Sequence, residues 1–432
     1  MPLFDPKSLQ PGVPRKEVFA WAMYDFANSG YTTVVLTAVF NAYFVGVVMQ
    51  GAPAATLVWT LLLSASYVIG MLVMPALGAY ADVHARKKLL LGIVTAICVL
   101  STALLALVGE GDLWLAAPLI IVSNLCFAAG VTFNSAFLPE LARPEALGKV
   151  SGWGWSIGYL GGLLALALCL AWVLAAQGRG EPATQYVPVT LLITAALYAL
   201  ASIPAFTVLR ERAQPQSQMT VASVVRESKA RLWHTLANIH AYRDFGWLML
   251  CGLLYQAGLS VVVALAAIYA QEVMKFSTAQ TMMLILVVNV TAAIGAFGFG
   301  YVQDRVGHKR ALALTIAGWI AMVAIAAGSS GMMGFWIAAN IAGLCMGSSQ
   351  SAGRAMVGVF APPRRLAEFY GLWNAAVWLS AIVGPVTYGL VTWLTDNDHR
   401  LAMMVTGLYF VAGLLVLAKV DVARGRTAAA AD

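Results

Sequence analysis

Two opposite charges stand inside long apolar stretches of the chain, Asp25 near its start and Arg354 near its end. A charged side chain at bilayer depth costs about 2.5–3.5 kcal/mol on insertion scales, so each one needs a physical reason. At 1.5 Å of rise per residue, both lie roughly 10 Å inside their stretches. An arginine can hold a carboxylate through two parallel hydrogen bonds, and an aspartate can hold an ammonium group or a proton. These two residues are the first candidates for chemistry.

Uncharged polar residues within apolar stretches extend the set of candidates. Asn28 follows Asp25 by about one helical turn and therefore lies on nearly the same face. Each such residue could instead bond a neighbouring helix, a contact worth about 0.6 kcal/mol on average in a membrane. The other uncharged candidates are Tyr31, Asn134, Gln256, Asn340 and Gln350.

Groupings typical of catalysis or metal binding are missing from the sequence. The five cysteines fall inside apolar stretches and lack the paired spacing of metal sites. No two histidines stand four residues apart, and no nucleophile is paired with a base. We therefore expect no enzyme activity, no metal and no cofactor.

The composition indicates what surrounds these residues. The chain has 432 residues, of which 61% are hydrophobic and only 10% are charged, whereas a soluble domain carries about 25% charged residues. Lipid must replace water around most of such a chain. The net charge of +7 is concentrated in the connections, which favours membrane topology over nucleic-acid binding.

Apolar stretches of about 20 residues, the length that crosses a bilayer, recur along the chain. The first six predicted helices cover 18–49, 57–82, 88–108, 113–139, 148–177 and 186–208. The second six cover 244–273, 278–303, 309–328, 332–359, 366–394 and 400–419. The sequence thus predicts an all-α integral membrane protein with twelve transmembrane helices. An N-terminal six-helix bundle, 1–208, is joined by a linker over 209–243 to a C-terminal six-helix bundle with a short tail, 244–432.

Basic residues gather in the connections on one side of this arrangement. They include Arg15, Lys16, Arg86, Lys87, Lys88, Arg143, Lys149, Arg305, Lys309, Arg310, Arg364 and Arg365. The other side holds only Arg179, Lys275 and Arg400. Because cytoplasmic loops carry the excess of lysine and arginine, we expect both termini in the cytoplasm of a multi-pass protein of the cell (inner) membrane.

The linker shows a pattern of its own. Apolar residues recur at three- and four-residue steps between basic ones, at Val221, Val225, Leu232, Leu236 and Ile239. This pattern predicts an amphipathic helix on the cytoplasmic membrane surface. Docking of a partner protein is the alternative.

Corresponding hairpins of the two halves carry the same pattern. The first reads Gly78-Ala-Tyr-Ala-Asp82-Val-His-Ala-Arg86-Lys87-Lys88. The second reads Gly300-Tyr-Val-Gln-Asp304-Arg305-Val-Gly307-His-Lys309-Arg310. In both, an aspartate follows a glycine by four positions and precedes a basic cluster. Chance rarely produces this at matching places, and parallel halves of this kind build one large transporter fold.

These hairpins resemble the loop signature of the major facilitator superfamily, G-x-x-x-D-R-x-G-R-R/K. The second copy keeps its glycines, its aspartate and its arginine, whereas the first has Val83 and Ala85 in place of the basic residue and the second glycine. The resemblance implies an aspartate that braces a helix end of the other half and holds the cytoplasmic side closed. A carboxylate near a helix N-terminus is favourable by about 0.3–1 kcal/mol, which suits a latch that must open.

Three further blocks are similar to the vacuole-effluxer-like branch of that superfamily, whose yeast member is linked to amino-acid release from the vacuole. They are Trp21-Ala-Met-Tyr-Asp-Phe-Ala-Asn-Ser-Gly-Tyr31, Phe133-Asn-Ser-Ala-Phe-Leu-Pro-Glu140, and Val150-Ser-Gly152 with Gly158-Tyr-Leu-Gly-Gly162. The resemblance implies a monomeric secondary transporter in the lipid bilayer that moves a small molecule by alternating access. An amino acid or small peptide, exported, is the first expectation. Export of drugs or amphiphilic metabolites is the alternative, and a transporter-like receptor is a remote one.

Within the superfamily arrangement, spans 1, 4, 7 and 10 line the central cavity, which leaves three interpretations of the buried charges open. Asp25 and Arg354 pair when the cytoplasmic side is closed and separate when it opens. Alternatively, they grip the ammonium and carboxylate groups of a substrate. In the third interpretation, each is satisfied within its own half. If the first holds, neutralising either charge should damage transport more than swapping the two.

Two further expectations concern coupling and packing. If transport is active, the proton is the expected driving ion and Asp25 its carrier, although a persistent Arg354 partner favours the charged carboxylate and leaves passive facilitation open. A face of small residues recurs every four positions at Gly154, Gly158 and Gly162. We expect this face to pack against a helix of the other half, so that the halves can rock.

Overall fold

The computed structural model describes residues 4–52, 54–215, 242–272, 274, 278–329, 331–396 and 398–431, with 264–272 and 278–282 described by their backbone only. Helices dominate, and these residues hold no strand beyond one isolated bridge between Leu9 and Ala142. Within the described part of the chain, twelve helical segments are long and apolar enough to cross a membrane. The prediction of an all-α protein with twelve transmembrane helices is therefore confirmed. The predicted amphipathic helix of the linker falls on 216–241, outside the described residues.

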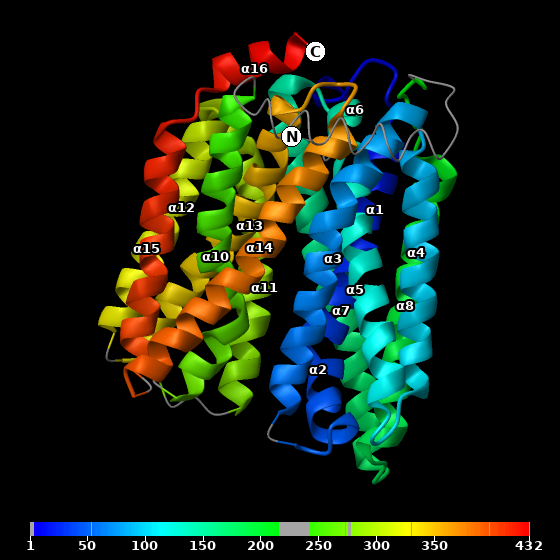
Figure 1. Cartoon of the computed structure of the whole chain (residues 1–432), viewed down its shortest axis with the longest axis vertical. Helices are drawn as coiled ribbons and strands as arrows, with labels where there is room; N and C mark the ends of the chain where they lie inside the picture. The colour runs from blue at the N-terminus through cyan, green and yellow to red at the C-terminus, as the bar shows by residue number, and fades with distance from the viewer. Residues whose placement is uncertain are drawn as a thin grey trace.

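Figure 1 shows the two bundles side by side, with both chain ends at the same end of the molecule, which we call the termini side. The first bundle consists of η1 (Pro6–Ser8), α1 (Arg15–Tyr31), η2 (Thr32–Ala38), α2 (Phe40–Tyr43), η3 (Phe44–Val48), α3 (Ala55–His84), α4 (Lys87–Leu104), η4 (Leu105–Leu107), α5 (Leu113–Ser135), α6 (Leu138–Leu141), η5 (Pro144–Ala146), α7 (Leu147–Gly178) and α8 (Ala183–Val208). The second consists of α10 (Arg243–Glu272), α11 (Thr278–Val306), α12 (His308–Gly328), α13 (Met332–Phe360), α14 (Leu366–Leu394), α15 (His399–Ala418) and α16 (Val422–Ala430).

The first span is not the single regular helix predicted over 18–49. After α1 it widens into the π-helical stretches η2 and η3, where Val39 N bonds Val34 O at 2.9 Å and Met49 N bonds Phe44 O at 2.9 Å, five residues back. The run of β-branched residues from Thr32 to Val35 crowds the preceding turn of an α-helix, and a wider turn relieves that crowding. π-Helical stretches are rare in proteins, and those that occur often lie at functional sites.

Glycines let the two halves approach closely on the termini side. A methyl group added at Gly300 of α11 would lie 2.8 Å from the carbonyl oxygen of Gly148 of α7. One added at Gly371 of α14 would lie 3.2 Å from the carbonyl oxygen of Met74 of α3. Helix α7 therefore docks on α11 and α3 docks on α14, each pair joining opposite halves.

The glycine stripe predicted to face the other half mainly faces the first span of its own half. A methyl group at Gly158 would lie 3.1 Å from the Ser29 hydroxyl, and one at Gly162 would lie 2.7 Å from the Thr33 hydroxyl. That prediction was wrong because α7 presents two glycine stripes. Gly148 and Gly152 form the one that meets α11.

Candidate functional site

Arg354 of α13 and Asp25 of α1 meet between the two halves. Nη1 of Arg354 lies 2.6 Å from Oδ2 of Asp25, and the two side chains are only 6% and 10% exposed. Nδ2 of Asn134, from the end of α5, donates to Oδ1 of Asp25 at 2.9 Å. Three of the sequence-predicted candidates, contributed by three helices, thus share one buried contact, which we call the charge cluster.

The guanidinium group of Arg354 packs against Trp21, Ser151 and Trp155 of the first half, a set of residues that we call the seat. Its Nε donates to the Ser151 hydroxyl at 3.1 Å, and its Nη2 donates to the Ser151 carbonyl at 2.8 Å. Its Cζ lies 4.8 Å from the ring centre of Trp21 and 5.4 Å from that of Trp155. Indole faces attract cations, most strongly where water is excluded. The site therefore selects a planar guanidinium rather than any positive charge.

Sequence reasoning missed these three seat residues. Trp21 and Ser151 stand within the blocks that resemble the vacuole-effluxer-like branch, so that resemblance was the one signal that pointed to them. Trp155 carried no signal, because only the docking of α7 and α13 shows which side of the helix faces the arginine. The interpretation in which each charge is satisfied in its own half does not describe this arrangement, since the three hydrogen bonds that the Arg354 side chain makes to described residues all go to the first half.

The two signature aspartates brace helix ends of opposite halves. Asp82, at the end of α3, accepts a hydrogen bond from the backbone amide of Glu368 in the first turn of α14, at 2.9 Å. Asp304, at the end of α11, accepts from the amides of Gly148 and Lys149 in the first turn of α7, at 3.1 and 3.2 Å. The first amides of a helix have no partner inside it and carry partial positive charge. The two contacts are therefore reciprocal caps between the halves.

The other signature residues shape these turns. Ala85 ends α3 with φ +51° and ψ 52°, and Gly307 precedes α12 with φ +91° and ψ 148°. The first copy therefore departs from the signature at a position with left-handed backbone, yet its aspartate still reaches the helix end. Arg86 and Arg305 are exposed. Gly78 lies against the backbone of α14, as Gly300 does against that of α7.

Other sequence-predicted candidates lie apart from the charge cluster. Nε2 of Gln256 donates to Oε1 of Gln350 at 2.8 Å, within the second half. Tyr31 is fully buried and its hydroxyl lies 2.8 Å from that of Ser123. Asn340 bonds a carbonyl of its own helix. Their roles in lining a cavity stay predictions.

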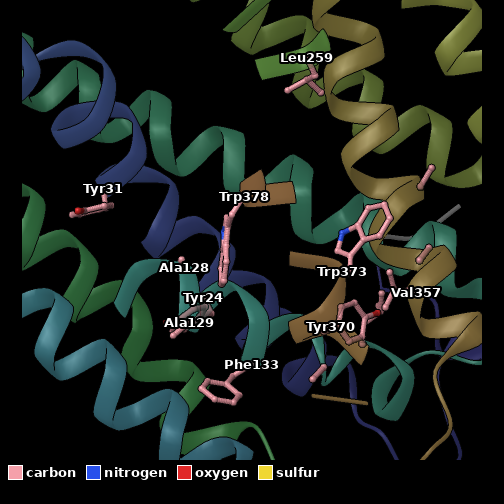
Figure 2. Close-up of a cluster of buried hydrophobic side chains, with 14 of the residues drawn as sticks. Tyr24, Tyr31, Ala128, Ala129, Phe133, Leu259, Val357, Tyr370, Trp373 and Trp378 are labelled. Atoms are coloured by element: carbon pink, nitrogen blue, oxygen red, sulfur yellow. The ribbon is translucent and has the colours of Figure 1, made fainter. Parts of the chain in front are cut away.

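Polar and aromatic side chains of α14 also contact the first half. Nδ2 of Asn374 donates to the Thr132 hydroxyl of α5 at 2.8 Å. The ring of Trp378 lies against Gly70 of α3, where an added methyl group would come within 2.7 Å of it. Figure 2 shows Trp378 and Trp373 among the buried aromatic side chains at this level.

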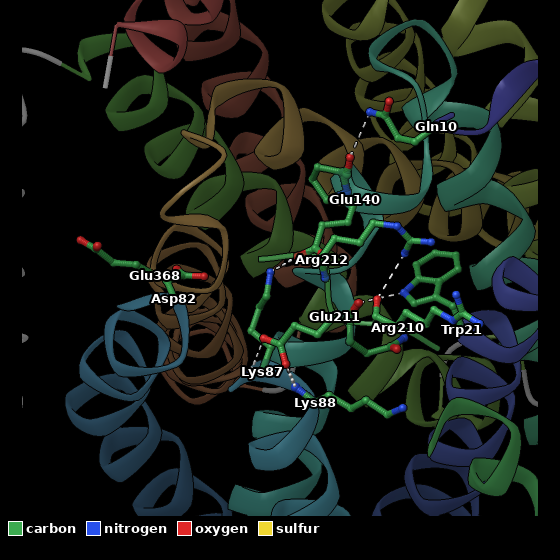
Figure 3. A network of polar contacts seen from close by, with 12 residues as sticks. Gln10, Trp21, Asp82, Lys87, Lys88, Glu140, Arg210, Glu211, Arg212 and Glu368 are labelled. Atoms are coloured by element: carbon green, nitrogen blue, oxygen red, sulfur yellow. Dashed lines mark hydrogen bonds and ion pairs between the residues drawn. The ribbon is translucent and has the colours of Figure 1, made fainter. Parts of the chain in front are cut away.

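A network of ion pairs holds the start of the linker against the first half, as Figure 3 shows. Arg212 binds both oxygens of the fully buried Glu17, at 2.6 and 2.7 Å. Lys87 pairs with Glu140, whose other oxygen accepts from the amide of Arg212 at 3.0 Å. Hydrogen bonding to Glu17 raises the pKa of Arg212 above its usual value. These ion pairs join the start of the linker to the first half and not to the second, so they stiffen that half rather than close the gap between the halves.

All described hydrogen bonds between the halves lie in the parts of the spans nearest the termini side. The deepest joins Asn374 to Thr132, and the outermost are the two aspartate caps. Among the described residues, no group of three histidine, cysteine, aspartate or glutamate side chains could hold a metal ion. The arrangement is a closed contact on one side, built around one buried ion pair.

Solved transporter structures share this arrangement of helices. The proton:xylose symporter XylE, bound to 6-bromo-6-deoxy-D-glucose, gives a TM-score of 0.72 at 16% sequence identity, covering 94% of this chain and 95% of that one. The human organic anion transporter MFSD10 (TETRAN) gives 0.70 at 14% identity, covering 94% and 100%. At these identities the likeness shows the fold, which is that of the major facilitator superfamily of membrane transporters.

The sequence carries the assignment further. The family described as "Vacuole effluxer Atg22 like" matches residues 42–430, and the chain belongs to this family. The MFS-type transporter YxiO of Bacillus subtilis is 26% identical over 410 residues, which are 93% of this chain and 94% of that protein. Autophagy-related protein 22 of Yarrowia lipolytica is 21% identical over 342 residues, which are 72% of this chain and 56% of that protein. Both resemblances predicted from the motifs are confirmed.

Proposed function

We propose that this major facilitator transporter exports an amino acid or small peptide by alternating access, with the termini side facing the cytoplasm of the cell. The observation that carries the proposal is the Asp25–Arg354 pair, which joins the halves through a 2.6 Å contact. A pair of opposite charges is also what a zwitterion presents, so a substrate can compete for both partners. The excess of basic residues on the termini side supports its cytoplasmic placement.

In this mechanism the described conformation is closed to the cytoplasm. Opening separates Arg354 from Asp25 and the two aspartates from their helix ends. Each cap is worth about 0.3–1 kcal/mol, so substrate binding can offset their loss. Once Asp25 is separated from Arg354 it can take up a proton, which couples export to the proton gradient.

Binding and transport by the purified protein test this proposal. A thermal-shift screen covers amino acids, dipeptides, sugars and hydrophobic cations, and each stabilising compound then enters a counterflow assay in proteoliposomes with and without a pH gradient. The proposal predicts stabilisation by zwitterions and pH-driven exchange of the same compounds. Stabilisation by hydrophobic cations alone would contradict the substrate class. Uptake that ignores the pH gradient would contradict proton coupling.

A further inference from the structure

Three buried polar atoms around the charge cluster have no hydrogen-bond partner among the described residues. They are Nδ2 of Asn28, Oδ1 of Asn134 and Nε1 of Trp155. An unpaired buried donor or acceptor costs about 1–3 kcal/mol, and native structures hold few of them. All three belong to residues that contact the ion pair or stand one helical turn from it in the chain, which points to this region as a place for a bound molecule.

Each of these atoms belongs to a residue tied to the ion pair. Asn134 already gives its amide to Asp25, and the ring of Trp155 covers one face of Arg354. Asn28 lies three residues after Asp25, which places the two side chains as neighbours on one helix face. Asp25 and Asn28 keep 7% and 6% of their surface exposed, so the site is not sealed.

Arg354 itself is poorly placed to take a ligand in this conformation. Its Nε and both terminal nitrogens donate to Asp25 and Ser151, and its Cζ lies 4.8 and 5.4 Å from the ring centres of Trp21 and Trp155. Both oxygens of Asp25 also accept hydrogen bonds. The unpaired atoms are therefore the groups that remain available to bind a ligand. The charges of Asp25 and Arg354 determine the electrostatic field around them.

We propose that these atoms bind the zwitterionic group of an α-amino acid. The ligand carboxylate accepts from the two free donors, Asn28 and Trp155, and lies close to the positive charge of Arg354. The ligand ammonium donates to the free carbonyl oxygen of Asn134 and lies close to the negative charge of Asp25. This inference rests on the proposed function and names the atoms that bind the charged groups of the substrate.

Ordered water could satisfy the same atoms, so the test must separate the two occupants. The probes are the twenty L-amino acids and, for each one that binds, its carboxamide and its des-amino acid. The variants are Asn28→Leu and Trp155→Phe, which remove one donor each. The control is Trp247→Phe, because the indole nitrogen of Trp247 is also buried and unpartnered but its ring lies under Lys419, far along the chain from the cluster. Binding is measured by calorimetry on the purified full-length protein.

We expect each variant to bind the amino acid about tenfold more weakly than the wild type, since one hydrogen bond to a charged group is lost. The carboxamide should bind the wild type weakly and lose little further in the variants, and Trp247→Phe should match the wild type. Variants that bind the amino acid as well as the wild type would overturn the inference alone and leave the atoms to ordered water. A wild type that binds no amino acid would overturn the proposed substrate class as well.

Discussion

Oδ2 of Asp25 lies 2.6 Å from Nη1 of Arg354, although 329 positions separate the two residues in the chain. They belong to opposite halves, so in the proposed mechanism the contact exists only while the termini side is closed. A buried ion pair gains its attraction at the cost of desolvating both charges, and breaking it from one side is far more damaging than replacing both partners. This asymmetry makes the pair testable by stability alone.

Neutralising one partner should therefore destabilise the protein more than neutralising both. Asp25→Asn or Arg354→Met each leaves one buried charge without its partner, at a cost of about 3–5 kcal/mol. We expect the double variant Asp25→Asn/Arg354→Met to recover most of that loss. Thermal unfolding in detergent measures it. A double variant that loses as much as the two single variants combined would argue against direct pairing.

Exchanging the two charges should restore the protein only in part. The pair is reversed in Asp25→Arg/Arg354→Asp, but the Ser151 carbonyl and the two indole rings that hold the guanidinium then face a carboxylate. We expect counterflow activity above that of either single variant and clearly below that of the wild type. Full recovery would mean that the seat on the first half contributes nothing.

The turn after α3 should be improved by one substitution. Ala85 has φ +51°, a conformation that costs residues other than glycine about 1–2 kcal/mol. Ala85→Gly should therefore raise the stability to thermal unfolding by about 1 kcal/mol. The matched control is Gly307→Ala, which should lower stability by about 1–3 kcal/mol because φ +91° with ψ 148° suits glycine almost exclusively. Equal effects of the two substitutions would contradict this description of the turns.

Removing either aspartate cap should loosen the closed side. Asp82→Asn and Asp304→Asn keep the shape of the side chain but lose the charge that favours the helix end. In a Ser351→Cys background, whose cysteine lies buried beside Ser151, both changes should speed labelling by a membrane-impermeant thiol reagent applied to the termini side. Asp112→Asn is the control, since the carboxylate of Asp112 accepts from the amide of the nearby Gly109 within the first half. Unchanged labelling in both variants would mean that the caps do not hold the side closed.

The sequence was sufficient for the parts of the fold that depend on local composition. Long apolar stretches located all twelve spans, because crossing a bilayer requires them whatever the tertiary packing. The sequence was not sufficient for features that depend on contacts between neighbouring helices. The π-helical part of the first span and the choice between the two glycine stripes of α7 both depend on how helices dock. The helix α16 lay beyond the apolar pattern and was predicted only as a short tail.

The sequence predicted the charged residues of the candidate site but not the residues that hold the Arg354 guanidinium in place. Asp25 and Arg354 were conspicuous because charge is costly in a membrane, and Asn134 because it is polar within an apolar stretch. Trp21, Trp155 and Ser151 are ordinary residues of membrane helices, so their types gave no reason to select them. Tyr31 was selected for its hydroxyl, which instead bonds Ser123 inside the first half. Side-chain type predicted what needs a partner, but not which partner it has.

In the proposed mechanism the halves rock about the charge cluster, and one side closes as the other opens. Pairs of spin labels on exposed positions measure this directly in a background without the native cysteines. Arg86→Cys with Arg310→Cys spans the halves on the termini side, and Arg179→Cys with Arg400→Cys spans them on the opposite side. When Asp25→Asn, Asp82→Asn and Asp304→Asn are combined, we predict that the first distance lengthens while the second shortens. Two distances that stay fixed, or that lengthen together, would contradict alternating access built on these contacts.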